Sequence, residues 1–400
     1  MSRDRNLLFA TAFLRSTGTS LVGVLLGVYL AKLHLAASQI GLVVGLGLAG
    51  AAVAALVVTV TGDRLGRRKT LAVLACTGAA GTLVAASSSR LDVLAAAAFV
   101  GMLNGMGRDR GASLVLEQAI LPGVTGEARR TLGFAWYSAA QDVGHARGAL
   151  HAGTPQRVQR WAGVDDLTSF RWVLAANCVL LLATVVLYRL LSPAAERANT
   201  PRPVAPSRET RSALWKLSAL FGLDSLAGGF LTTALLSFFF FERFGVSEAV
   251  IGLLFFGARL ANTASHFGAA WIASRIGLVR TMVFTHLPSS LLLLTVPFAP
   301  TFPVAAALFL LREGLVEMDV PTRTSYVMAI VRPEDRTFAS GVTNLVRLGG
   351  WALAPGFAGL LMRGAALGAP LVVGAAMKIA YDLILYRAFK ERRPPEEAIS

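Results

Sequence analysis

Long apolar runs separated by short polar gaps dominate this chain. At a helical rise of about 1.5 Å per residue, roughly 20 apolar residues cross the hydrocarbon core of a bilayer. Runs of this kind occupy residues 7–33, 38–61, 70–88, 92–121, 131–155, 170–191, 213–241, 247–273, 281–299, 303–331, 337–362 and 367–389. The pattern predicts an all-α integral membrane protein with twelve transmembrane helices.

One polar segment interrupts this rhythm. Residues 192–212 are rich in Pro, Arg, Ser and Ala and carry no apolar stripe. This composition is typical of a linker. It predicts two six-helix halves, 1–191 and 213–400, joined by a cytoplasmic linker. The run at 7–33 is too long for the core of a signal peptide, so we expect it to be a retained first helix.

Composition and charge support the membrane assignment. Hydrophobic residues make up 54% of the chain and charged residues only 15%, against roughly 25% charged in soluble domains. The net charge of +15 does not indicate nucleic-acid binding, because the cations lie in the short gaps. With a cytoplasmic N-terminus, 22 Lys and Arg fall inside and 7 outside. This ratio predicts that both termini are cytoplasmic, in a plasma or inner membrane.

The two halves share an internal repeat. Ile40-Gly41-Leu42 recurs as Ile251-Gly252-Leu253, and Arg64-Leu65-Gly66 recurs as Arg275-Ile276-Gly277, both at an offset of 211. Asp109 matches Asp319 at 210. A nearly constant offset indicates duplication. Because each half has an even number of spans, the halves should insert in parallel.

The gap between spans 2 and 3 reads Gly62-Asp63-Arg64-Leu65-Gly66-Arg67-Arg68-Lys69. A positive-inside anchor would explain the three final cations but not the glycines or the acid. The loop, the span number and the repeat resemble the major facilitator superfamily, and its twelve-helix drug/proton antiporter branch in particular. The resemblance implies a latch in which Asp63 caps span 11 near Thr337 and Glu117 pairs with Arg64 or Arg68. The expected latch residues are Gly62, Asp63, Arg64, Gly66, Arg67, Arg68 and Glu117.

Two further glycine motifs resemble those of the family in altered form. Span 4 contains Asn104-Gly105-Met106-Gly107, but Gly101 stands where the family has arginine, which weakens an implied proton-coupling role. Span 5 contains Gly144, Gly148 and Gly153, with Ala149 where efflux members have proline. Close packing of small residues is the alternative interpretation of these glycines.

Charged residues inside the spans are functional candidates, because burying a charge in lipid is costly. The family resemblance implies that spans 1, 4, 7 and 10 line a central cavity. For proton coupling we expect Glu313 and Glu317, which share one face of span 10, since close carboxylates resist simultaneous ionisation, and Asp224. The carrier should be the acid that no arginine contacts. The expected substrate-cavity residues are Arg15, Asn104, Arg108, Asp109, Asp142, Arg312, Asp319 and Arg347.

Structural roles compete with these assignments. Asp142 is expected to hold Arg15 or Arg147, and Asp319 can form an ion pair with Arg323. The histidines lie on different helices or depths and Cys76 and Cys178 lie within apolar runs, so neither a metal site nor a disulfide is expected.

The leading hypothesis is a monomeric secondary transporter that exports a small organic compound in exchange for protons. It requires a small-molecule substrate, protons and a bilayer, with no cofactor and no nucleic acid. A nucleotide-driven transporter is not expected, since the chain has no Walker A pattern and no soluble domain of adequate size. An enzyme is not expected either, since no nucleophile–base set is visible. A proton-coupled nutrient importer of the same fold and a non-transporting receptor or scaffold are the alternatives.

Overall fold

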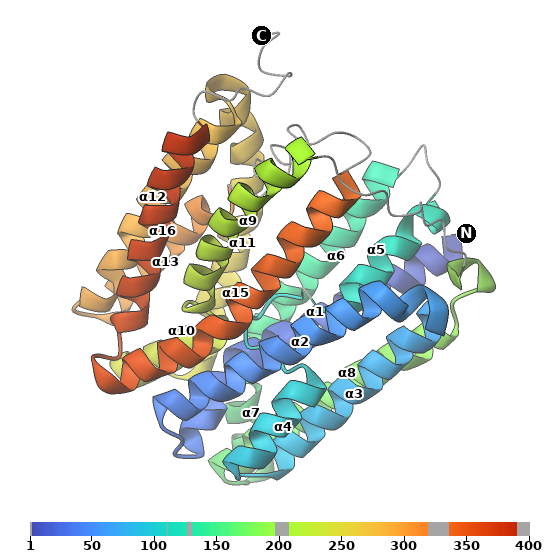
Figure 1. The fold of residues 1–400 in the computed structure, drawn as a ribbon. Coiled ribbons are helices and arrows are strands. Elements are labelled where there is room, and N and C mark those ends of the chain that lie inside the picture. Colours follow the sequence, from blue (N-terminus) through green and yellow to red (C-terminus); the bar gives the residue numbers. More distant parts are fainter. Residues whose placement is uncertain (1, 110, 126–129, 197–207, 319–335, 390–400) are drawn as a thin grey trace. The chain divides into compact units, whose positions relative to one another are not determined.

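The computed structural model describes residues 2–109, 111–125, 130–196, 208–318 and 336–389, with some side chains within these ranges excepted. Across these ranges the chain is all helical, which confirms the predicted fold class (Figure 1). The helices are α1 (Ser2–Lys32), α2 (Ala37–Leu65), α3 (Arg67–Ser87), α4 (Leu91–Gly101), α5 (Ala112–Thr125), α6 (Arg130–Leu150), α7 (Thr154–Ala162), α8 (Asp166–Arg189), α9 (Arg208–Gly229), α10 (Thr233–Phe244), α11 (Glu248–Ile276), α12 (Leu278–Thr295), α13 (Phe302–Val316), α15 (Arg336–Gly364) and α16 (Ala369–Phe389).

Each of the twelve predicted spans contains helix. Within the described residues, eight helical segments are long and apolar enough to cross a membrane. They include α1, α2, α3, α8, α12 and α16, and their ends agree with the sequence pattern to within a few residues. Apolar length alone was therefore sufficient to locate most of the helices.

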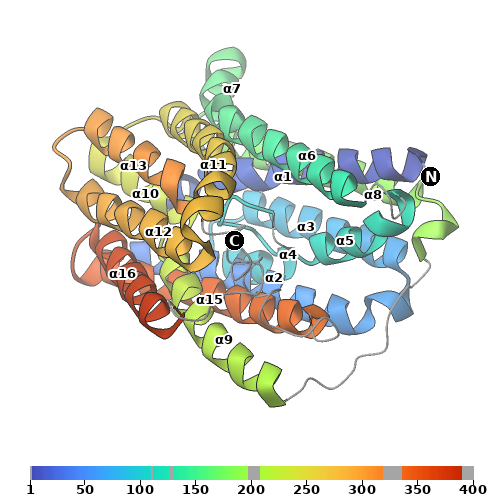
Figure 2. The same cartoon turned by 90° about the horizontal axis from the view of Figure 1, so that it is seen from above.

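The chain forms two compact units. The first unit comprises Met1–Thr200, Thr232–Phe256 and Pro355–Gly364, and in it α1 packs along α6 and α8, while α3 packs along α8 and α4. The second unit comprises Pro201–Leu231, Gly257–Ala354 and Ala365–Ser400. In it α12 packs against α16 and α13, and α9 packs against α16 (Figure 2).

The fourth predicted span is a broken helix rather than a continuous one. α4 ends at Gly101, and Met102 adopts a left-handed conformation with φ 53°. Irregular backbone follows until α5 begins at Ala112, and Gly107 within it has φ +68°. A Cβ at Gly107 would also lie 2.6 Å from Thr233 Oγ1, so only glycine fits there. The glycine motif therefore unwinds this span.

Protein groups satisfy the backbone freed by this break. Asn104 Oδ1 accepts from the Met106 N–H at 2.9 Å, and Asn104 Nδ2 donates to the Arg108 carbonyl at 2.7 Å. The first turn of α10 supplies further partners. The Ala234 N–H donates to the Gly105 carbonyl at 2.9 Å, and the Thr233 hydroxyl donates to the Met106 carbonyl at 2.8 Å. Irregular backbone at membrane depth needs such internal partners, because lipid offers none.

The seventh predicted span is also broken. α9 ends at Gly229, and α10 begins at Thr233 after Thr232, whose hydroxyl caps α10 by accepting from the Leu235 N–H at 3.3 Å. The N-terminus of α10 is therefore free to dock on the unwound segment of span 4. The apolar run predicted a single helix here, although Gly228-Gly229 followed by Thr232-Thr233 was an available signal of the break.

Glycines set the closest helix contacts in the first unit. A Cβ at Gly50 on α2 would lie 1.9 Å from the Phe99 carbonyl oxygen on α4, and one at Gly81 on α3 would lie 2.4 Å from Gly101 Cα. These contacts bring backbones together as small-residue motifs do in membranes.

Gly50→Ala should destabilise the protein by about 1–3 kcal/mol, because the added methyl group has to push α2 away from α4. Thermal unfolding of the purified protein in detergent measures the effect. Gly123→Ala on α5 is the matched control, because nothing lies within 4 Å of its new Cβ. Equal unfolding temperatures for the two variants would contradict the close α2–α4 contact.

Candidate functional site

Glu117 on α5 is a completely buried carboxylate at the centre of the first unit. Its Oε1 accepts from Thr11 at 2.7 Å and from Tyr188 at 2.6 Å. Its Oε2 accepts a short hydrogen bond from Tyr137. Arg15 on α1 donates to both oxygens, at 2.7 and 2.9 Å. Hydrogen bonding of this density is what allows a carboxylate to remain buried.

Arg15 uses all five of its N–H donors within this network. Nε donates to Asp109 Oδ2 at 2.6 Å. Nη1 donates to Glu117 and to the Tyr188 hydroxyl. Nη2 donates to Glu117 and to the Tyr137 hydroxyl, the latter at 3.3 Å. The side chain was expected to anchor substrate. The geometry instead makes it the cation that joins α1 to α5, α6 and α8.

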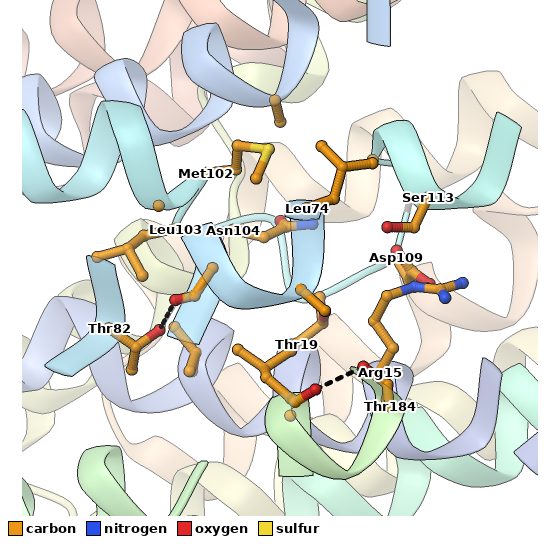
Figure 3. A pocket seen from close by; sticks show the side chains of 18 of the residues that line it. Arg15, Thr19, Leu74, Thr82, Met102, Leu103, Asn104, Asp109, Ser113 and Thr184 are labelled. Carbon is orange, nitrogen blue, oxygen red and sulfur yellow. Dashed lines mark hydrogen bonds and ion pairs between the residues drawn. The ribbon is translucent and has the colours of Figure 1, made fainter. Parts of the chain in front are cut away.

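Asp109 lies in the unwound segment and faces Arg15 (Figure 3). Its Oδ2 also lies 3.4 Å from Gln141 Nε2, and its backbone N–H donates to His145 Nε2 at 2.9 Å. The acceptor role requires that this His145 nitrogen carries no proton. The break in span 4 thus places an acid beside α1 and α6.

A cavity of about 100 Å³ opens beside this network. Arg15, Asn104 and Asp109, three of the predicted substrate residues, lie on its wall. Other lining residues include Thr19, Thr82, Ser113, Asn177 and Thr184, many of them labelled in Figure 3. A cavity of this size and polarity has room for several waters or a small polar solute.

Two other predicted cavity residues of the first half lie elsewhere. Asp142 on α6 is exposed, and Arg15 pairs with Asp109 and Glu117 instead of Asp142. Of the two cations expected for Asp142, Arg15 is therefore wrong, and Arg147 stays a prediction. Helical spacing could not reveal this, because Asp109 reaches Arg15 only through the unwound segment. Arg108 lies in that segment next to Asp109 and offers its carbonyl to Asn104.

The motif between α2 and α3 binds the carboxylate of Glu196, which lies outside the motif and was not among the predicted latch residues. Glu196 accepts from the backbone N–H groups of Arg67 at 2.6 Å and Arg68 at 3.1 Å, so it caps the N-terminus of α3. Gly66, with φ +87°, makes the turn between the helices. Arg68 Nη2 donates to the Arg189 carbonyl at the end of α8 at 2.7 Å.

The predicted latch pairing is therefore corrected. Glu117 does not pair with Arg64 or Arg68, because Arg15 and the two tyrosines surround its carboxylate and Arg64 is exposed. Gly62 has a packing role, since a Cβ there would lie 2.9 Å from Leu116 Cδ2. The side chains of Asp63 and Thr337 lie outside the described set, so their expected contact stays a prediction.

In the second unit, an arginine contacts Glu313, although the proton carrier was expected to be an acid that no arginine contacts. Glu313 forms a short ion pair with Arg312, the next residue of α13, and its Oε2 accepts from Asn262 Nδ2 at 3.0 Å. Neighbouring residues of a helix point about 100° apart, so spacing did not predict this pair. Glu317 is the C-cap residue of α13.

Asp224 has a cation partner, Lys378, that the spacing of charges along single helices did not predict. Lys378 Nζ on α16 lies 2.8 Å from Asp224 Oδ1 and 3.3 Å from His286 Nε2 on α12. His286 Nδ1 lies 2.9 and 3.0 Å from the two oxygens of Asp382. All four side chains are buried. Asp382 and Lys378 are a helical i, i+4 pair, which was the available sequence signal.

The remaining predicted residues contribute less. Arg347 stacks over the Trp351 ring, with 4.8 Å between the guanidinium carbon and the ring centre. Asp319 and its expected partner Arg323 lie outside the described residues.

A third charged cluster, at the Lys32 end of α1, joins segments distant in the sequence. Lys32 Nζ lies 2.5 Å from Asp166 Oδ2 and 3.2 Å from Glu248 Oε1 at the start of α11. Gln156 donates to the other Glu248 oxygen at 2.9 Å. Nearby, a Cβ at Gly153 would lie 2.8 Å from Ala249 Cβ. These contacts attach residues 248–249 to the first 200 residues within the first unit.

Glu117→Gln should lower stability by about 3–5 kcal/mol, since it breaks a buried ion pair and turns amide hydrogens toward the donors of Arg15 and Tyr137. Thermal unfolding in detergent reports the loss. Asp92→Asn, which removes an exposed partner of Arg90, is the control and should leave the unfolding temperature unchanged. A wild-type unfolding temperature for Glu117→Gln would mean that Glu117 is already neutral.

Comparison with known proteins agrees with this architecture. The chain is 26% identical over 418 residues to the uncharacterized membrane protein YJR124C of Saccharomyces cerevisiae, covering 96% of this chain and 93% of that protein. The fold of the present chain is similar to that of a bacterial homolog of the human lysosomal transporter Spinster in an inward-facing, occupied conformation (TM-score 0.75, 15% identity, 97% of each chain). It is also similar to the inward-open xylose transporter XylE of E. coli (TM-score 0.71, 12% identity, 99% and 98% covered). The family profile of the Major Facilitator Superfamily matches residues 8–355. The chain therefore belongs to the Major Facilitator Superfamily, and it is a multi-pass membrane transport protein rather than an enzyme.

Proposed function

We propose that this protein is a proton-coupled secondary transporter that exports a small polar organic compound by alternating access. We place it in a plasma or inner membrane with both termini in the cytoplasm, as the distribution of Lys and Arg predicts. The observation that carries the proposal is the polar cavity at the break of span 4.

The lining of that cavity supports a solute of modest size with hydrogen-bonding groups. Hydroxyl and amide side chains from α1, α3, α5 and α8 converge on it, and Asp109 adds a carboxylate.

Alternating access is supported by the composition of the first unit. Segments Thr232–Phe256 and Pro355–Gly364 come from the second half of the sequence, yet they pack with the first 200 residues. The Lys32–Glu248 ion pair and the Gly153–Ala249 contact are reversible connections of this type. We infer that they close the extracellular end in one state and separate in the other.

A flux experiment tests the transport function. A thermal-shift screen of the purified protein against a metabolite and drug panel first identifies a ligand, and proteoliposomes then report its movement under an imposed pH gradient. Flux opposite to the proton gradient supports export, and flux in its direction would instead indicate the importer. A ligand that binds but never crosses would point to a receptor.

The cavity itself is tested by Ser113→Leu, which fills it from the α5 side. We expect ligand affinity to fall about tenfold to a hundredfold, because overpacking costs about 1–3 kcal/mol. Ser138→Leu is the matched control, since Ser138 is an exposed residue of α6. Undiminished affinity in Ser113→Leu would place the ligand elsewhere.

A disulfide between Gly153→Cys and Ala249→Cys should lock the closed end and abolish transport until a reductant is added. The two Cβ positions are close enough for a bridge after a small adjustment. The background carries Cys76→Ala and Cys178→Ala, which removes the two native thiols. The control is the reduced double variant, which carries the same close contact without the bridge. Full transport by the oxidised, cross-linked protein would exclude opening at this point.

A further inference from the structure

The second unit contains a buried network that the cavity and the loop motif do not involve. Four side chains form a line of contacts: Asp224 on α9 contacts Lys378 on α16, Lys378 contacts His286 on α12, and His286 contacts Asp382 on α16. The exposed fraction of the side chain is 9% for Asp224 and 7% for Lys378. It falls to 2% for His286 and 0% for Asp382. The network therefore has a more accessible and a closed end.

The contacts of His286 define its hydrogen-bonding state. A carboxylate only accepts hydrogen bonds, so Nδ1, close to both Asp382 oxygens, must carry a proton. In the neutral ring, Nε2 then presents a lone pair. Lys378 Nζ lies 3.3 Å from it and can donate to it, while also donating to Asp224. Every contact is satisfied with His286 neutral.

A second proton on the ring changes this arrangement. Nε2–H would face the Lys378 ammonium, so two donors would oppose each other. Asp224 Oδ1 lies only 4.0 Å from Nε2 and can take over as acceptor. Within these four groups the net charge would change from −1 to zero, which burial favours. The network thus has two alternative hydrogen-bonding patterns that differ by one proton.

Several other described groups lie on the helices around His286. The Tyr381 ring packs edge-on against His286, with 6.0 Å between ring centres. α13 also packs against α12, but Arg312 pairs with Glu313, which binds Asn262, and Glu317 is at the C-cap. On α12 itself, Arg280 is exposed.

We propose that these four side chains form a one-proton site and that protonation of His286 Nε2 moves Lys378 away from α12. The proton comes from water through the Asp224 end and adds to the Nε2 lone pair; the Lys378 Nζ–H···Nε2 bond is lost, and Nε2–H pairs with Asp224. Because the network connects α9, α12 and α16, its occupancy changes how firmly these helices are joined. The coupling role of the site rests on the transport function proposed above.

Proton uptake by the purified full-length protein tests the site without a substrate. A pH-sensitive dye in weakly buffered detergent solution counts the protons bound between pH 8 and pH 5. His286→Gln should take up about one proton fewer than wild type. Asp224→Asn should show the same loss, because it removes the acceptor for Nε2–H. Glu242→Gln, which removes an exposed carboxylate, is the control for handling and detergent. Its difference from wild type gives the change in proton uptake that an ordinary surface acid causes.

Infrared difference spectra of histidine-labelled protein separate this site from an ordinary surface histidine. The other four histidines contribute equally to wild type and Asp224→Asn. Subtracting one acid-induced spectrum from the other should therefore leave one imidazolium band together with a carboxylate change. Full wild-type imidazolium intensity in Asp224→Asn would overturn the proposal. If His286→Gln is not recovered folded, Asp224→Asn carries the same comparison alone.

Proteoliposome flux then tests coupling. His286→Gln should lose the dependence of transport on the pH gradient but keep solute exchange at equal pH. Wild-type dependence on the gradient in this variant would refute the coupling role. Absence of flux in the wild type would refute the transport function alone, because proton uptake would still report on the site.

Discussion

The buried carboxylate of Glu117 is the interaction on which the first unit depends. A bare carboxylate in a membrane protein interior is costly, and here it is balanced by one arginine and three hydroxyl donors from three helices, α1, α6 and α8. Because all five N–H donors of Arg15 bind groups of this network, α1 is connected to α5, α6 and α8 at a single point. The unwound segment of span 4 can then lie beside α1 with Asp109 in place, and the cavity forms next to it.

The same requirement, that polar groups be satisfied without water, explains why both breaks occur together. Unwinding span 4 frees the carbonyls of Gly105 and Met106, and the start of α10 supplies donors because a helix N-terminus has unpaired N–H groups. Breaking span 7 at Thr232 creates that N-terminus. Neither break would be stable in lipid without the other, so the two discontinuities form one structural feature.

The sequence predicted the fold well because its signals are long and local. Apolar length located the helices, and the loop motif with the number of spans indicated the family. The site was predicted less well. Arg15, Asn104 and Asp109 line the same cavity, but the partners of Arg15 were not predicted. Asp109, Glu117 and Tyr188 lie 94, 102 and 173 residues from Arg15 in the sequence. Helical spacing describes neighbours on one helix and contains no information about such contacts. The unwinding also turned Asp109 away from where a continuous helix would place it.

The two buried networks differ in what they can do, and this difference bears on function more than their shared burial does. In the first, every Arg15 donor has a carboxylate or hydroxyl partner, and arginine does not lose its proton, so no second arrangement is available without breaking the set. In the second, Asp224 lies within reach of both Lys378 and His286, and the Nε2 atom of the neutral His286 ring has a lone pair that can accept a proton. A saturated network with one arrangement stabilises a helix bundle. A network with two arrangements of similar quality can respond to its surroundings. In a transporter of this family, a rigid network beside the cavity and a switchable one in the other unit would separate the task of shaping the solute site from that of sensing protons.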